Sequence, residues 1–175
     1  MTAEQYNQLA DRIRNTPGLL TTIRVSNVLL TAAGFLAYPI LLLFLFPFGM
    51  VDAAPFLLYL AGPALAFVLL SLFRRIINRR RPYETMDIRP LISKNKKGRS
   101  FPSRHVFSFA MIAVLWFPFY PLVCPILLVG TFLLAVIRVV SGVHTIEDVL
   151  AGALLGILAG SLINMIFYLL IVAPS

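Results

Sequence analysis

The feature that most constrains this chain is a series of long stretches without a charged residue. One runs from Val25 to Val51, a second from Ala53 to Phe73, and a third from Val149 to Pro174. As a helix, each is long enough to cross the roughly 30 Å of hydrocarbon in a bilayer. Hydrophobic residues make up 59% of the chain, against roughly 45–50% in soluble proteins. The sequence therefore predicts an all-α membrane protein.

A further uncharged run, from Val106 to Ile137, is too long for one spanning helix and slightly short for two. As one helix it would measure about 48 Å, more than the hydrocarbon core accommodates without severe tilt. Pro118, Pro121 and Pro125 cluster in its middle, where a turn would be needed. We therefore predict two spans here, and a polytopic helix bundle with about five transmembrane helices in all.

A chain of 175 residues is expected to form one domain, because two would each lack a sufficient core. The first 24 residues are polar and lack the apolar region of a signal peptide. We expect a single membrane-embedded domain over 1–175, with an N-terminal segment at 1–24, a basic loop at 74–104, and spans at 25–51, 53–73, 105–120, 122–140 and 149–173.

The N-terminal segment has the pattern of a short amphipathic helix over residues 2–15. Thr2 and Gln5 fit a capping box, and the apolar residues Tyr6, Leu9, Ala10 and Ile13 share one face. Our fold prediction places this helix in the membrane interface, as amphipathic helices often are. Packing of the apolar face on the protein's own loops is an equally good interpretation.

Charge is distributed very unevenly along the chain. All 15 Lys and Arg lie in the N-terminal segment, the 74–104 loop and the 138–148 loop, which five spans place on one side of the membrane; the opposite side carries only Asp52. The positive-inside rule makes the basic side cytoplasmic, in a multi-pass protein of a bacterial-type inner membrane. The formal charge of +8 indicates anionic headgroups or a phosphorylated substrate as partners, not nucleic acid. The single cysteine, Cys124, can form no disulfide within the chain.

Two histidines stand at the charged ends of apolar runs, and each has polar neighbours suited to chemistry. His144 is followed four residues later by Asp148, whose carboxylate can hold one imidazole nitrogen and leave the other free as a nucleophile. Arg138 lies six residues before His144, at the end of a span, where a charge is costly and tends to be functional. A snorkelling arginine that binds headgroups is the alternative interpretation.

The second histidine, His105, follows Ser103 and Arg104 at the predicted start of a helix, where a hydroxyl, a guanidinium and backbone amides favour an anion. An imidazole at this place could protonate a leaving alkoxide. Arg74 and Arg81 belong to a dense basic run upstream, and arginine binds phosphate oxygens in a bidentate manner. Alone, such a run is more typical of headgroup binding than of catalysis.

Together these segments resemble the type 2 phosphatidic acid phosphatase family, which also includes vanadium haloperoxidases. That family has three motifs in order: Lys, six residues and Arg-Pro; then Pro-Ser-Gly-His; then Ser-Arg, five residues, His, three residues and Asp. The corresponding residues here are Arg74 with Arg81-Pro82; Pro102-Ser103-Arg104-His105; and Ile137-Arg138 with His144 and Asp148. The resemblance covers roughly residues 74–160.

The resemblance implies a role for each matching residue. His144 would attack phosphorus and carry a phosphohistidine, Asp148 would orient it, and His105 would protonate the leaving lipid oxygen. The phosphate-binding residues would be Arg74, Arg81, Ser103, Arg104 and Arg138. No metal and no other cofactor is implied, and the sequence offers no plausible set of metal ligands.

Three positions depart from the family pattern. Arg74 replaces a lysine and Ile137 a serine, and Arg104 replaces a glycine at a place where close backbone approach to phosphate is expected. Arg104 could crowd the pocket or contact a second phosphate or an acidic headgroup. The departures leave the substrate open.

The function that we expect is hydrolysis of a phosphomonoester or diphosphate on a lipid, such as phosphatidic acid, phosphatidylglycerol phosphate or a polyprenyl (di)phosphate. A phosphotransferase on the same fold and a non-catalytic lipid-phosphate-binding protein remain alternatives. Gly152, Gly156 and Gly160 form a stripe suited to close helix packing. We expect this packing inside the bundle, with a homodimer face as the second interpretation.

Overall fold

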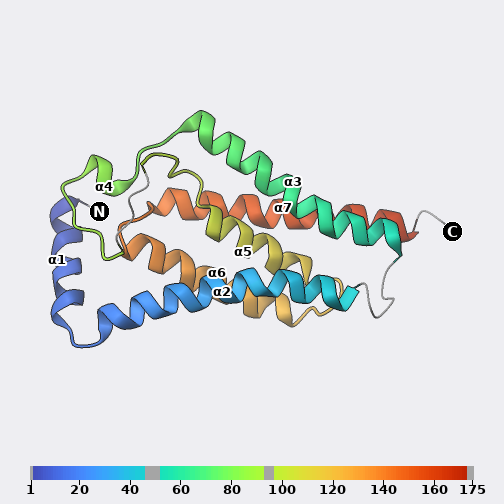
Figure 1. Cartoon of the computed structure of the whole chain (residues 1–175), viewed down its shortest axis with the longest axis horizontal. Helices are drawn as coiled ribbons and strands as arrows, with labels where there is room; N and C mark the ends of the chain where they lie inside the picture. The colour runs from blue at the N-terminus through green and yellow to red at the C-terminus, as the bar shows by residue number, and fades with distance from the viewer. Residues whose placement is uncertain (1, 46–51, 93–96, 173–175) are drawn as a thin grey trace.

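The computed structural model describes residues 2–45, 52–92 and 97–172 (Figure 1). Within these ranges every regular element is a helix, which confirms the predicted all-α class. The helices are α1 (Ala3–Asn15), α2 (Leu19–Leu45), α3 (Ala53–Ile77), α4 (Pro82–Thr85), α5 (Arg104–Leu115), α6 (Val123–Val140) and α7 (Ile146–Val172). The apolar helices α2, α3, α5, α6 and α7 run along the molecule, whereas α1 and α4 lie at one end of the bundle (Figure 1).

Four of the described helices, α2, α3, α6 and α7, are long and apolar enough to cross a membrane. The 12-residue α5 is apolar but shorter. Large apolar side chains point away from the bundle, as Phe35 of α2 does with 75% of its surface exposed, and only lipid makes such a surface favourable. The first span begins at Leu19 instead of Val25, because Gly18, with φ of +78°, turns the chain directly from α1 into α2. Its predicted end, residues 46–51, lies outside the described residues.

The run from Val106 to Ile137 forms two helices, as predicted. α5 ends at Leu115, and α6 begins at Val123. Turn residues between them include Pro118 and Pro121, which have no backbone N–H to continue a helix. Because the connection is short, the start of α5 and the end of α6 lie at the same end of the bundle, together with the start of α7 (Figure 1).

The glycine stripe of α7 packs against α5 within the chain. A Cβ atom on Gly152 would come within 2.6 Å of the Ser103 carbonyl oxygen, and one on Gly156 within 2.3 Å of that of Phe107. Both distances are far below van der Waals contact, so only glycine permits this approach. The stripe therefore supports the bundle itself, which was the preferred of the two interpretations.

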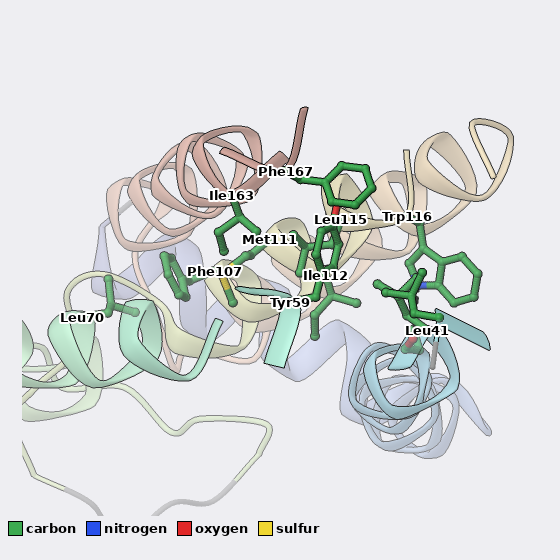
Figure 2. Close-up of a cluster of buried hydrophobic side chains, with 12 residues drawn as sticks. Leu41, Tyr59, Leu70, Phe107, Met111, Ile112, Leu115, Trp116, Ile163 and Phe167 are labelled. Atoms are coloured by element: carbon green, nitrogen blue, oxygen red, sulfur yellow. Dashed lines mark hydrogen bonds between the residues drawn. The ribbon is translucent and has the colours of Figure 1, made fainter. Parts of the chain in front are cut away.

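The core lies between α2, α3, α5 and α7, away from the end that carries α1. Figure 2 shows Tyr59 of α3 beside Phe167 of α7, with ring centroids 5.3 Å apart in an edge-on arrangement. The Tyr59 hydroxyl donates to Oδ1 of Asn164 at 2.6 Å, and Asn164 Nδ2 donates to the carbonyl oxygen of Val114 at 2.8 Å. This chain of hydrogen bonds joins α3, α7 and α5 where no water can satisfy their polar groups.

The N-terminal helix is amphipathic and has the predicted capping box, in which the Gln5 amide donates to Thr2 Oγ1 at 3.2 Å. Its apolar face, however, is covered by protein and not by the membrane interface. Tyr6, Ala10 and Ile13 are buried in a cluster with Ile88 and Leu91. The structure therefore shows the packing on the protein's own loops, and the place of this helix in the membrane interface stays a prediction.

Candidate active site

The segments named from the sequence meet at the end of the bundle that carries α1 and α4 (Figure 1). Three helix ends converge there: the start of α5, the end of α6 and the start of α7. The loop that joins α4 to α5 lies against them, since the Ser103 amide donates to the carbonyl oxygen of Asp148 at 2.8 Å. This contact places the second and third motifs side by side.

His144 and Asp148 are in contact, although not on one helical face. α7 begins only at Ile146, so His144 precedes it. Thr145 caps the helix: its amide donates to Asp148 Oδ2 at 3.0 Å, and its hydroxyl accepts from the Asp148 amide at 3.2 Å. This reciprocal cap brings Oδ2 to 3.3 Å from His144 Nδ1. The cap therefore makes the pair, because α7 begins after His144 and cannot place both side chains on a helical face.

The His144 side chain is almost completely buried, with 4% of its surface exposed. Burial, which disfavours the charged form, lowers the pKa of this imidazole to about 4. The hydrogen bond to Asp148 opposes the shift, while the positive charges of Arg81 and Arg138 add to it. His144 is therefore neutral near pH 7. With Nδ1 facing the carboxylate, its other nitrogen, Nε2, carries the free lone pair that a nucleophile needs.

Arg74 and Arg81 are buried and bind backbone carbonyl groups of the 97–100 segment. Arg74 Nη1 donates to Ser100 O at 3.1 Å, and Nη2 donates to Arg99 O. Arg81 Nε donates to Gly98 O at 3.2 Å, and its Nη1 reaches Val143 O at 3.4 Å, next to His144. These contacts use part of each guanidinium to order the loop and leave further N–H groups for an anion.

Arg138 has unused donors inside the protein. Only 2% of its surface is exposed, and its Nη2 donates to Thr31 Oγ1 of α2 at 3.3 Å. Among the described residues, Nε and Nη1 of Arg138 and Oγ of Ser103 have no hydrogen-bond partner. Buried polar atoms without partners are costly, and acceptor oxygens of a bound anion are the kind of partner that these donors lack.

His105 and Arg104 stand in the first turn of α5, directly after the buried Ser103. His105 is half-buried at the same end of the bundle as His144. The guanidinium of Arg104 lies over the ring of Phe67 on α3, 5.5 Å from its centroid. It therefore extends toward α3.

Ser100 is a buried site residue that the sequence analysis did not identify. Its hydroxyl donates to Oδ2 of Asp148 and lies 3.4 Å from Nδ1 of His144. No motif used above includes this position, and a serine in a polar loop is unremarkable by composition. Only the contact of the loop with Asp148 shows that Ser100, three residues before Ser103, belongs to the site.

Two further charged residues, Arg79 and Glu84, were also not singled out. Arg79 pairs with Glu147 at 2.6 Å and lies 3.7 Å from Oδ1 of Asp148. Glu84 accepts the Gly98 amide at 2.8 Å and the Arg81 amide at 2.8 Å. Arg79 was visible as part of the basic run, but nothing distinguished it from its neighbours.

Comparison with known proteins identifies the same family by sequence and by structure. Residues 55–171 match the family model described as PAP2 superfamily. The crystal structure of LpxE from Aquifex aeolicus superposes with a TM-score of 0.69 and 26% identity, covering 94% of each chain. A transmembrane PAP2-type phosphatidylglycerolphosphate phosphatase from Bacillus subtilis has the same fold, with a TM-score of 0.60 and 24% identity over 93% of this chain and 84% of that one.

A sequence relative is the bacitracin transport permease protein BcrC of Bacillus licheniformis, which is 33% identical over 99 residues. The match covers 54% of this chain and spans about half of the relative, 49% of its length.

Proposed function

Because the chain belongs to the PAP2 superfamily, we propose that it is a membrane phosphatase that removes a phosphate group from a lipid through a phosphohistidine on His144. One observation carries the proposal. A buried, neutral histidine is held at Nδ1 by Asp148, at the end of the bundle where Arg138 Nε and Nη1 and Ser103 Oγ are buried with no hydrogen-bond partner among the described residues. A nucleophile next to a ready-made anion site is the arrangement that phosphoryl transfer requires.

In the first step, the Nε2 lone pair of His144 attacks phosphorus, and the bond from phosphorus to the lipid oxygen breaks. Protonated His105 gives its proton to that oxygen, so the lipid alcohol leaves neutral. Asp148 accepts the Nδ1–H of His144 throughout, which stabilises the positive charge that develops on the ring.

In the second step, water attacks the phosphohistidine. Neutral His105 takes a proton from the water, the bond from phosphorus to nitrogen breaks, and its electron pair returns to Nε2. Inorganic phosphate leaves, and both histidines regain their starting states. No metal takes part in either step.

The phosphate oxygens bind to the unused N–H groups of Arg74, Arg81 and Arg138 and to the Ser103 hydroxyl. These four side chains are buried, so their interaction with charge is weakly screened. Arginine suits a trigonal-bipyramidal transition state because its planar group contacts two oxygens at once.

We propose a lipid monophosphate or diphosphate as substrate: phosphatidic acid, phosphatidylglycerol phosphate or a polyprenyl (di)phosphate. The similar protein from Bacillus subtilis is a phosphatidylglycerolphosphate phosphatase, which supports a lipid phosphate as the substrate. We further propose that the protein lies in the cell membrane with the site on the cytoplasmic face, because all 15 Lys and Arg belong to segments on the site's side.

The experiment is phosphate release by detergent-purified protein from a panel of these lipids, with EDTA present. We expect release by the wild type and a loss of more than about 10³-fold in His144→Ala. An acid-labile, alkali-stable label from a radioactive substrate would identify the phosphohistidine. Release by His144→Ala at the wild-type rate would contradict the nucleophile, and release that stops with EDTA would contradict the metal-independent mechanism. A product that appears only with an alcohol acceptor would indicate a phosphotransferase.

A further inference from the structure

We propose that Ser100 is a positioning residue that holds the His144 imidazole in the tautomer whose Nε2 is free to attack. The inference rests on the proposed role of His144 as nucleophile. Ser100 belongs to none of the three motifs, and it connects the 97–100 segment, which binds Arg74 and Arg81, to the nucleophile.

Ser100 is completely buried, and each of its polar groups is used. Its amide donates to Arg79 O at 2.9 Å, and its carbonyl oxygen accepts from Arg74 Nη1 at 3.1 Å. Its hydroxyl oxygen contacts Asp148 Oδ2 and lies 3.4 Å from His144 Nδ1. Ser100 therefore joins the end of α3, the phosphate-binding Arg74 and the His144–Asp148 pair.

The proton positions follow from the number of donors and acceptors. An ionised carboxylate accepts only, so the Ser100 hydroxyl must give its single proton to Asp148. The Thr145 amide donates a second hydrogen bond to Asp148 Oδ2, at 3.0 Å. Nδ1 of His144, at 3.3 Å from Oδ2 and 3.4 Å from the Ser100 oxygen, then faces two acceptors.

A nitrogen that faces two acceptors must carry a proton. The Nδ1–H tautomer is thus the one that the site favours, and Nε2 keeps its lone pair for phosphorus. Ser100 contributes twice: its proton anchors the carboxylate in this orientation, and its oxygen is the second acceptor for Nδ1–H. Without it, Asp148 Oδ2 loses one of its donors and His144 loses one of its two acceptors.

The variant Ser100→Ala tests this role, because alanine keeps the backbone N–H and C=O that bind Arg79 and Arg74. The phosphate pocket should therefore persist. We expect kcat to fall on the order of 10- to 100-fold, as for other partners that orient a ligand or nucleophile, with KM changed less than about 3-fold. An unchanged kcat, or a rise in KM that accounts for the whole effect, would overturn the proposal.

The matched control is Ser71→Ala, which also removes a buried hydroxyl oxygen. Ser71 lies on α3, and its Oγ has no hydrogen-bond partner among the described residues. We expect this variant to retain wild-type kcat and melting temperature in detergent. Ser100→Ala should melt close to the wild type as well; a collapse of its melting temperature together with its activity would assign Ser100 a structural role and overturn the proposal.

A double-mutant cycle with Asp148→Asn asks whether Ser100 acts through Asp148. If it does, adding Ser100→Ala to Asp148→Asn should lower kcat by less than about 3-fold, because the oriented carboxylate is already lost. If instead kcat of the double variant falls by the product of the two single losses, Ser100 does not act through Asp148.

A spectroscopic test separates this inference from the proposed function. The chain has only two histidines, so ¹⁵N NMR of the imidazoles resolves His144 once His105→Ala removes the other signal. We expect the Nδ1–H tautomer at pH 7 in the wild type and a measurable Nε2–H population in Ser100→Ala. A wild-type Nε2–H tautomer would overturn the role of Ser100. If instead no lipid releases phosphate while the tautomer depends on Ser100, the proposed function fails and the positioning role stands.

Discussion

At the residue scale, the chemistry of His144 is governed by how little water reaches it. Because burial disfavours the imidazolium, the pKa of His144 lies near 4, and the side chain stays neutral even at mildly acidic pH. We expect its ¹⁵N NMR signals, in the His105→Ala background, to titrate with a midpoint near pH 4. Asp148→Asn removes the group that opposes the shift, so it should lower the midpoint further. A midpoint near 6.5 would mean that the site is open to water.

Arg104 is the residue at which this chain departs most from its family. Its guanidinium lies over the ring of Phe67 on α3 and adds a positive charge in the first turn of α5. We expect this extra charge to favour a substrate with a second phosphate. Arg104→Gly should lower kcat/KM for a polyprenyl diphosphate by roughly 10-fold relative to the monophosphate, since a hydrogen bond to a charged group contributes about 1.5–3 kcal/mol.

The control for this prediction is Arg104→Lys, which keeps the charge and should retain most of the preference. Parallel assays on both substrates with the same protein preparation give the ratio directly. Equal loss for both lipids would show that Arg104 serves general phosphate binding, and no loss for either would confine it to its contact with Phe67.

At the scale of elements, the contact between α5 and α7 holds the site together. The α7 glycines allow the backbone of α5 to approach closely. Ser103 directly precedes α5, His105 lies in its first turn, and Asp148 lies in the first turn of α7. Gly156→Ala puts a methyl group 2.3 Å from the Phe107 carbonyl oxygen, so the helices must separate. We expect a loss of about 1–3 kcal/mol in the free energy of unfolding, measured by denaturation in detergent.

Leu158→Ala is the matched control for Gly156→Ala. Leu158 belongs to the same helix but is 55% exposed toward lipid, and its truncation leaves the α5–α7 contact intact. We expect its stability to lie within about 0.5 kcal/mol of the wild type. If both variants have the same free energy of unfolding, the close approach of α5 and α7 makes no particular contribution to stability.

At the scale of the whole molecule, we expect α2, α3, α5, α6 and α7 each to cross the membrane, so that the two ends of the bundle lie on opposite sides. Cys124 is the only cysteine, so Cys124→Ala gives a background for labelling. Gln8→Cys and Lys97→Cys lie at the site's end, and Tyr120→Cys lies at the turn between α5 and α6. We expect an impermeant thiol reagent to reach the first two from the cytoplasmic side and Tyr120→Cys from the other. Labelling of all three from one side would contradict five crossings.

Much of the architecture was accessible from the sequence because lipid imposes a simple rule. Backbone groups in hydrocarbon must bond internally, so uncharged runs near 20 residues become helices. The clustered prolines located the turn between α5 and α6, because proline has no backbone N–H to continue the bonding of a helix. Helix α2 begins at Leu19, before the predicted uncharged span at 25–51, because a helix can carry an arginine such as Arg24 at its membrane edge.

The site divides in the same way between sequence and tertiary structure. The sequence by itself proposed His144 and Asp148 as a pair, because a carboxylate four residues after a histidine can reach its ring, and it named the arginines by their charge. Only the tertiary structure decided that Ser100 lies on this pair, that Thr145 caps it, and that α1 packs its apolar face on protein. Those contacts join residues far apart in the chain or depend on where a helix begins, and no local pattern encodes which distant surface a side chain will meet.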